Sequence, residues 1–381
     1  MKADSKTPNS WIFSARLDLL WIIGPGILAV LIAILADWTG SPLAVLSSGS
    51  SRTDGQALPP WLWLILIPGL DVSHVYSTLF RAYFDRQQWQ ERRFLLSMTP
   101  LFCFLLALTI YSFGKLIFWR AMAYLAVFHF IRQQYGFLAL YSRKEPFSCK
   151  VFPFSWDKFT LYAITLLPIL YWHVAPNGRN FEWFMEGDFY SVPNSMLAHT
   201  ILYLYWSWIA VYSLSLIYTF LKTRSISWPK NLFLLNTGLV WYVGIIALND
   251  DLSFTITNVV NHGIPYMALV FLYGKYRRKN FSSFFYKAFA NTATGIIVFA
   301  ATLLLFAYSE EWLWDTFVWK DHSEIFGNAS LIKKGLGKGF EVILVPLFFL
   351  PQFTHYVLDG FLWKVSDKNR ELREFFGISI I

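Results

Sequence analysis

Four of the seven histidines lie inside apolar stretches of the sequence, where an ionisable side chain is costly. They are His74, His129, His262 and His355. A charged residue at the centre of a bilayer costs about 2.5–3.5 kcal/mol on insertion scales, so polar residues in such stretches mark candidate functional sites. Imidazole is a frequent metal ligand and a general base, and the four histidines therefore predict a metal-binding or acid–base site.

Two aspartates accompany these histidines at helical spacing. Asp71 lies three residues before His74 and Asp359 lies four residues after His355, so each shares a helical face with its histidine. An aspartate in this position can bind the same metal ion, or it can orient the imidazole by accepting a hydrogen bond. Spacing leaves both roles open. The expected metal ligands are His74, His129, His262, His355, Asp71 and Asp359.

Further polar residues share the histidine helices. Arg132 and Gln133 follow His129 by about one turn, and an arginine inside an apolar helix needs an acidic partner, a phosphate-bearing ligand or a water-filled cavity. Asp71 and Asp359 are the natural partners for it. Asn258 precedes His262 on one face. The expected catalytic residues are Arg132, Gln133, Asn258 and Tyr266.

The helix of His74 carries a longer polar stripe. Thr78, Arg81 and Asp85 continue the face of His74 at steps of four, three and four residues. Arg81 and Asp85 lie near the end of this helix, where the pattern allows them to emerge into water at the membrane surface.

The composition is that of a polytopic membrane protein. The chain has 381 residues, of which 56% are hydrophobic, 20% aromatic and only 15% charged. The net charge of +8 does not indicate nucleic-acid binding, because no basic stretch is interleaved with a folded polar domain. Two cysteines do not imply a disulfide framework.

Apolar runs of about twenty residues predict an all-α bundle of about ten transmembrane helices, in a single domain of residues 1–381 with no soluble domain. The expected helices lie near residues 17–37, 61–83, 94–114, 119–141, 159–176, 196–221, 231–248, 253–274, 289–308 and 340–363. In this topology most of the 32 Lys and Arg residues fall on the side that carries both termini. That bias predicts cytoplasmic termini and a multi-pass protein of the cell membrane, such as a bacterial inner membrane or its equivalent.

The predicted topology also places the four histidines at similar depth. Their helices are the second, fourth, eighth and tenth, and all run from the outside inward. Counting residues from each helix start places the four imidazoles within a slab of roughly 8 Å, so one shared site is geometrically possible.

These patterns favour an integral membrane metalloenzyme, namely a non-haem iron oxidoreductase that hydroxylates, desaturates or oxidatively cleaves a lipidic or isoprenoid substrate. Zinc, copper or haem could replace iron, and an electron-donor protein is a possible partner. The histidines are widely spaced, so the dense histidine boxes of membrane desaturases are absent. Two alternatives stay open: a metal-independent transferase with a histidine base and an arginine anion clamp, and a proton-coupled transporter.

Overall fold

The computed structural model describes residues 10–39, 60–176, 183–248, 251–327, 339–366 and 369–378. Every regular element within these ranges is a helix. The predicted all-α class is therefore confirmed for the part of the chain that the structure describes. The predicted cytoplasmic termini fall partly on residues 1–9 and 379–381, which lie outside the described residues.

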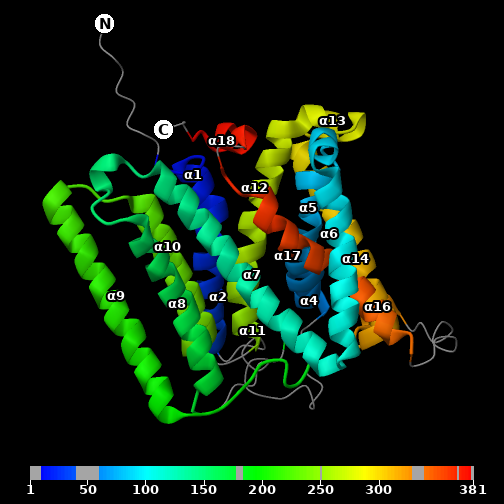
Figure 1. The fold of residues 1–381 in the computed structure, drawn as a ribbon, viewed down its shortest axis with the longest axis horizontal. Coiled ribbons are helices and arrows are strands. Elements are labelled where there is room, and N and C mark those ends of the chain that lie inside the picture. The colour runs from blue at the N-terminus through cyan, green and yellow to red at the C-terminus, as the bar shows by residue number, and fades with distance from the viewer. Residues whose placement is uncertain are drawn as a thin grey trace, which may run out of the picture. The chain divides into compact units, whose positions relative to one another are not determined.

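Figure 1 shows the helices under the labels used below. The α-helices are α1 (Ala15–Asp18), α2 (Gly24–Thr39), α4 (Pro60–Leu66), α5 (Ser73–Thr78), α6 (Arg86–Ser112), α7 (Lys115–Lys144), α8 (Phe154–Val174), α9 (Ser195–Thr223), α10 (Trp228–Trp241), α11 (Asp251–Phe254), α12 (Val260–Arg277), α13 (Ser283–Ala288), α14 (Thr292–Trp314), α15 (Ser323–Phe326), α16 (Glu341–Phe348), α17 (Leu350–Leu362) and α18 (Arg370–Phe376). Short π-helical turns join several of them, at Leu19–Ile23, Ile67–Val72, Leu79–Tyr83, Tyr242–Ala247, Thr255–Val259 and Asp315–Trp319. Single 3-10 turns occupy Phe147–Cys149 and Arg278–Asn280.

Six helical segments are long and apolar enough to cross a membrane. They are Ala15–Trp38, Pro60–Tyr83, Arg86–Ser112, Ser195–Thr223, Trp228–Ala247 and Thr292–Trp319. The pair α16 and α17, which bends by 41° between Phe348 and Leu350, makes a seventh if it is one broken span. A multi-pass membrane protein is consistent with these segments.

These segments correspond to seven of the ten predicted spans. The remaining three predicted spans lie near residues 119–141, 159–176 and 253–274. They are helical as α7, α8 and α11–α12, but they are not among the segments that are long and apolar enough to cross a membrane. Polar residues lower their hydropathy, and two of them carry His129 and His262. The number of spans therefore remains a prediction.

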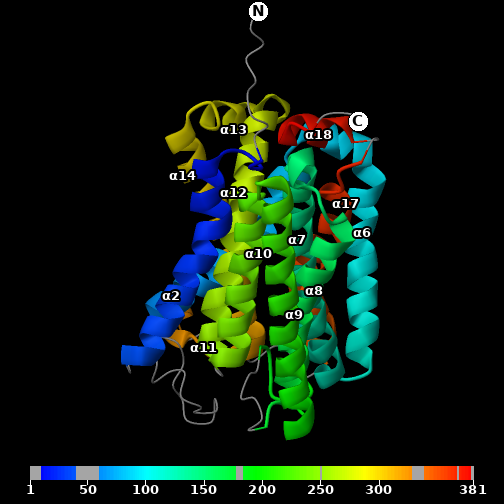
Figure 2. The same cartoon turned by 90° about the vertical axis from the view of Figure 1, so that its left-hand side faces the viewer.

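The chain divides into two compact units. The first comprises Met1–Gln56, Ala123–His262 and Arg370–Ile381. Within it α8 packs against α9 and α10, and α10 packs against α2, as Figures 1 and 2 both show. Close packing needs a small residue here: a Cβ atom on Gly26 of α2 would lie 2.4 Å from Asn261 Oδ1 and 2.5 Å from Asn236 Oδ1.

The second unit comprises Ala57–Met122 and Gly263–Asn369. Within it α17 packs against α5 and α6, and α14 packs against α5. An aromatic core that includes Phe80, Phe289 and Phe299 forms where α13 and α14 meet the Leu79–Tyr83 turn. Burial of such large side chains stabilises the contact between α14 and α5 that positions His74.

Candidate metal centre

His74 and His355 form one pair, on α5 and α17 of the second unit. Both side chains are only 1% exposed, and their ring centroids lie 5.0 Å apart. The packing of α17 against α5 brings them together, although 281 positions separate them in the sequence. Two buried imidazoles at this distance can both contribute a nitrogen to one metal ion.

A directed chain of hydrogen bonds fixes the His355 ring. Tyr266 donates its hydroxyl proton to Asp359 Oδ1 at 2.5 Å. The Tyr266 oxygen can then accept from Thr78 Oγ1 at 3.4 Å, and Thr78 Oγ1 can accept from His355 Nδ1 at 2.8 Å. Trp363 donates to the same Tyr266 oxygen at 3.3 Å. This polarity puts the His355 proton on Nδ1 and the lone pair on Nε2.

His74 has the same tautomer for a different reason. Its Nδ1–H donates to the backbone carbonyl of Leu70 at 3.3 Å, and a carbonyl oxygen can only accept. Leu70 lies in the π-helical turn Ile67–Val72, which contains Pro68 and Gly69 and precedes α5 directly. Such turns occur frequently at functional sites. The lone pair of His74 is therefore also on Nε2.

His129 and His262 form the second pair, within the first unit. Their ring centroids lie 4.9 Å apart, and the rings of Phe130 and His262 stack at 4.1 Å. Gln133 donates from Nε2 to the backbone carbonyl of His262 at 2.9 Å. His129 is 5% exposed and His262 is 1% exposed, so this pair is buried as well.

The four histidines form a group that could hold a metal ion. One candidate ligand nitrogen from each ring lies within 4.8 Å of those of the other three. The predicted ligands Asp71 and Asp359 lie beside this group: Asp71 Oδ1 is 3.8 Å from His74 Nδ1, and Asp359 Oδ1 is 3.7 Å from His355 Nδ1. Both carboxylates thus face the protonated nitrogens, opposite to the lone pairs.

Among the residues that the structure describes, Arg132 does not have the internal acidic partner that the sequence suggested. Its side chain is exposed, donates to Tyr162 Oη at 3.2 Å and stacks over the ring of Tyr135 at 4.7 Å. Arg132 lies at the edge of the buried face of α7, and its long side chain reaches outward to these two tyrosines. Asn258 is buried at 2% exposure and donates to the Phe254 carbonyl and to Thr257 Oγ1, within its own segment.

Arg81 and Asp85 do not emerge into water, because both are fully buried at 0% exposure. Arg81 donates to Tyr273 Oη at 3.0 Å and to the Leu362 carbonyl at 2.5 Å. Its guanidinium also stacks against Trp363 at 4.7 Å, beside the chain of hydrogen bonds that ends at Asp359. The Leu79–Tyr83 turn that carries Arg81 packs against α6, which begins directly after Asp85.

One buried carboxylate near this centre was not anticipated. Glu310 of α14 is 4% exposed and accepts hydrogen bonds from Tyr76 Oη at 2.6 Å, from Trp314 Nε1 at 3.3 Å and from Gln352 Nε2 at 3.4 Å. Its position at the end of a long apolar run resembles that of an ordinary interfacial charge. The only sequence feature that pointed to a buried Glu310 was the tryptophan four residues later, which lies on the same helical face.

Searches against protein-family models, curated proteins and solved structures find no match to this chain. Its function is therefore inferred from its own residues.

Proposed function

We propose that this chain is an integral membrane metalloenzyme in which His74, His129, His262 and His355 bind one non-haem iron ion. The proposed reaction is the oxidation of a lipidic or isoprenoid substrate by hydroxylation, desaturation or oxidative cleavage. The single observation that carries the proposal is the buried group of four imidazole nitrogens within 4.8 Å of one another.

The spacing of the four nitrogens suits a single ion. Metal–nitrogen bonds of about 2.0–2.1 Å place neighbouring ligands about 3.4 Å apart in a tetrahedral site, so binding one ion would draw the four nitrogens closer together. Imidazole suits iron, zinc and copper alike. Iron is proposed because it would supply oxygen chemistry at an apolar carbon, which zinc does not supply.

The chain's own residues would prepare this site before a metal arrives. The Leu70 carbonyl and the Thr78 hydroxyl hold His74 and His355 with Nε2 as the basic nitrogen. Asp359, through Tyr266 and Thr78, would stabilise the His355 orientation and raise its basicity. We therefore assign Asp71 and Asp359 the role of orienting the ligand histidines rather than that of binding the ion.

The membrane setting selects the substrate class. We propose ten spans with both termini cytoplasmic, in the cell membrane, so that the centre is reached from the bilayer by a lipidic molecule. Oxidation with dioxygen consumes electrons, and an electron-donor protein at the membrane surface would supply them. The group of four histidines favours the metalloenzyme over the transferase and the transporter, because neither alternative requires four imidazoles together.

Metal analysis of the full chain purified in detergent tests the proposal. We expect close to one equivalent of iron per chain by mass spectrometric elemental analysis after expression in iron-supplemented medium. Dialysis against a chelator should remove the iron, and ferrous iron should restore it. A protein without iron, zinc or copper above the level of a purification blank contradicts the proposal.

Asp359→Asn is expected to weaken metal binding without abolishing it. Asparagine keeps the size of the side chain but removes the charge that orients Tyr266 and, through Thr78, His355. Removing such supporting groups typically lowers metal affinity about 10–100-fold, which a competition titration with a fluorescent chelator measures. Tyr266→Phe should act in the same direction. An unchanged metal affinity in both variants would show that this chain of hydrogen bonds does not orient His355 for metal binding.

A further inference from the structure

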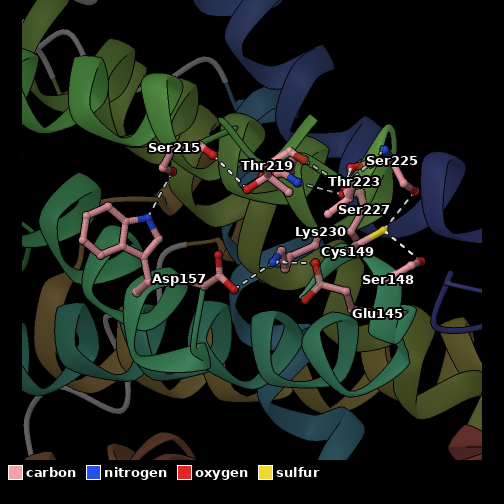
Figure 3. A network of polar contacts seen from close by, with 12 residues as sticks. Glu145, Ser148, Cys149, Asp157, Ser215, Thr219, Thr223, Ser225, Ser227 and Lys230 are labelled. Atoms are coloured by element: carbon pink, nitrogen blue, oxygen red, sulfur yellow. Dashed lines mark hydrogen bonds and ion pairs between the residues drawn. The ribbon is translucent and has the colours of Figure 1, made fainter. Parts of the chain in front are cut away.

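A second buried polar cluster lies in the first unit, where α8 and α10 begin. Lys230 of α10 lies between two carboxylates, with Nζ 2.7 Å from Glu145 Oε1 and 2.8 Å from Asp157 Oδ2 (Figure 3). The three side chains are between 6% and 9% exposed. None of them contacts the histidines described above through any hydrogen bond or ion pair of the described residues.

The charges of this cluster do not balance. Two carboxylates and one ammonium leave one negative charge in a buried place, and a buried charge without a counter-charge is strongly unfavourable. Burial raises the pKa of the Glu145 carboxyl above its ordinary value, while Lys230 lowers it. The charge of Lys150 also lowers the pKa of the Glu145 carboxyl, but Lys150 is exposed and, within the described part of the chain, forms no ion pair with either acid.

A small pocket lies against the cluster, lined by Glu145, Asp157, Ser227, Lys230 and Asn231 among others. Its internal volume of about 20 Å³ has room for one water molecule or one bare ion. The cavity is thus too small for a lipid headgroup or a metabolite.

Ser227 supplies an independent sign of a ligand. It is the N-cap residue of α10, where serine normally accepts a hydrogen bond from the first turn, but its side chain makes no such bond. Its Oγ is buried and has no hydrogen-bond partner, although the residue is only 4% exposed and lines the pocket. A buried hydroxyl without a partner costs about 1–3 kcal/mol, so an occupant of the pocket would relieve it.

Other oxygen atoms complete a donor set. Tyr212 contacts Asp157 Oδ1 at 3.1 Å and Asn231 Oδ1 at 2.9 Å, so its oxygen keeps lone pairs beside the pocket. Thr219 and Ser215 also line it with hydroxyl oxygens. Carboxylate, hydroxyl and amide oxygens are the ligands that hard cations prefer.

We propose that this pocket binds one monovalent cation, Na⁺ or K⁺, held by Glu145, by Ser227 and by the neighbouring hydroxyl oxygens. A single positive charge neutralises the cluster, whereas a divalent ion would leave an excess charge next to the ammonium of Lys230. The cation would link the segment between α7 and α8 to the start of α10. This site is independent of the metal centre proposed above.

Thermal unfolding of the full chain in detergent tests the site. At constant ionic strength and pH 7.5, we expect the melting temperature to rise saturably as N-methyl-D-glucamine chloride is replaced by NaCl or KCl. A shift of at least about 2 °C is expected at saturation, because a ligand that binds only the folded state stabilises it. Saturable uptake of radioactive Na⁺ by the same sample gives a second readout.

Two variants locate the effect. Ser227→Ala removes only the unpartnered hydroxyl, so this variant should fold. Glu145→Gln removes the excess negative charge and leaves the ion pair between Lys230 and Asp157 in place. Both should lose most of the cation-dependent shift and the saturable uptake. Ser148→Ala, at an exposed serine of the same segment outside the pocket, should keep both. Equal melting temperatures in the three salts without saturable uptake, or variants that retain the full response, overturn the proposal and leave a water molecule as the occupant.

Discussion

Alanine in place of His74, His129, His262 or His355 is expected to reduce metal affinity by at least about 100-fold, because loss of supporting residues alone already costs 10–100-fold. Each histidine would supply one of four bonds, and the remaining three imidazoles cannot move to replace it in a buried site. The same substitutions should abolish oxidation of the substrate. Metal content after size-exclusion chromatography, together with a competition titration, measures the effect.

His199→Ala is the matched control. His199 lies at the start of α9, and its side chain is exposed. Its removal should leave the metal content at the level of the parent protein. Circular dichroism and the elution volume show whether each variant is folded. The four-histidine site is excluded if folded variants of two or more of these residues retain the metal of the parent.

Asp85→Asn is expected to destabilise the protein by about 3–5 kcal/mol, because it removes one partner of a buried ion pair. Asp85 is fully buried, and Arg277 donates from Nε to its Oδ2 at 2.8 Å. Asp85 is also the N-cap of α6 and accepts from the backbone of Gln87 and Gln88. Asparagine preserves a cap of this kind, so the measured loss reports mainly on the charge.

Unfolding in denaturant, followed by circular dichroism in detergent, measures this loss. Asp85→Ala should cost about 1 kcal/mol more, since it also removes the cap. Glu374→Gln is the control, because the pair of Arg370 and Glu374 is exposed and should contribute less than about 1 kcal/mol. A change in Asp85→Asn no larger than that of Glu374→Gln would mean that Arg277 finds another partner.

The local predictions from the sequence agree with the structure where they depended on a single helix. Asp71 lies beside His74, and Asp359 lies beside His355, because residues three or four apart share a helical face. The apolar runs also correspond to helices near their predicted bounds. Both results follow from the geometry of one helix.

Predictions failed where the orientation of a helix decided the outcome. Arg132 was expected to face inward and is exposed, whereas Arg81 and Asp85, which the pattern allowed to emerge into water, are fully buried. For Arg81 and Asp85, the π-helical turns Ile67–Val72 and Leu79–Tyr83 shift the helical register, and no simple sequence signal marks these turns.

The sequence by itself determined an all-helical, membrane-type chain and the identity of four histidines in apolar segments, because composition and helical periodicity are local properties. Only the tertiary structure decided which side chains meet. Lys230 is one example, since the fold buries it against Glu145 and Asp157, which lie more than seventy positions earlier in the sequence. Contacts between helices depend on how ridges and grooves pack along their whole length, and no residue spacing within one helix encodes that.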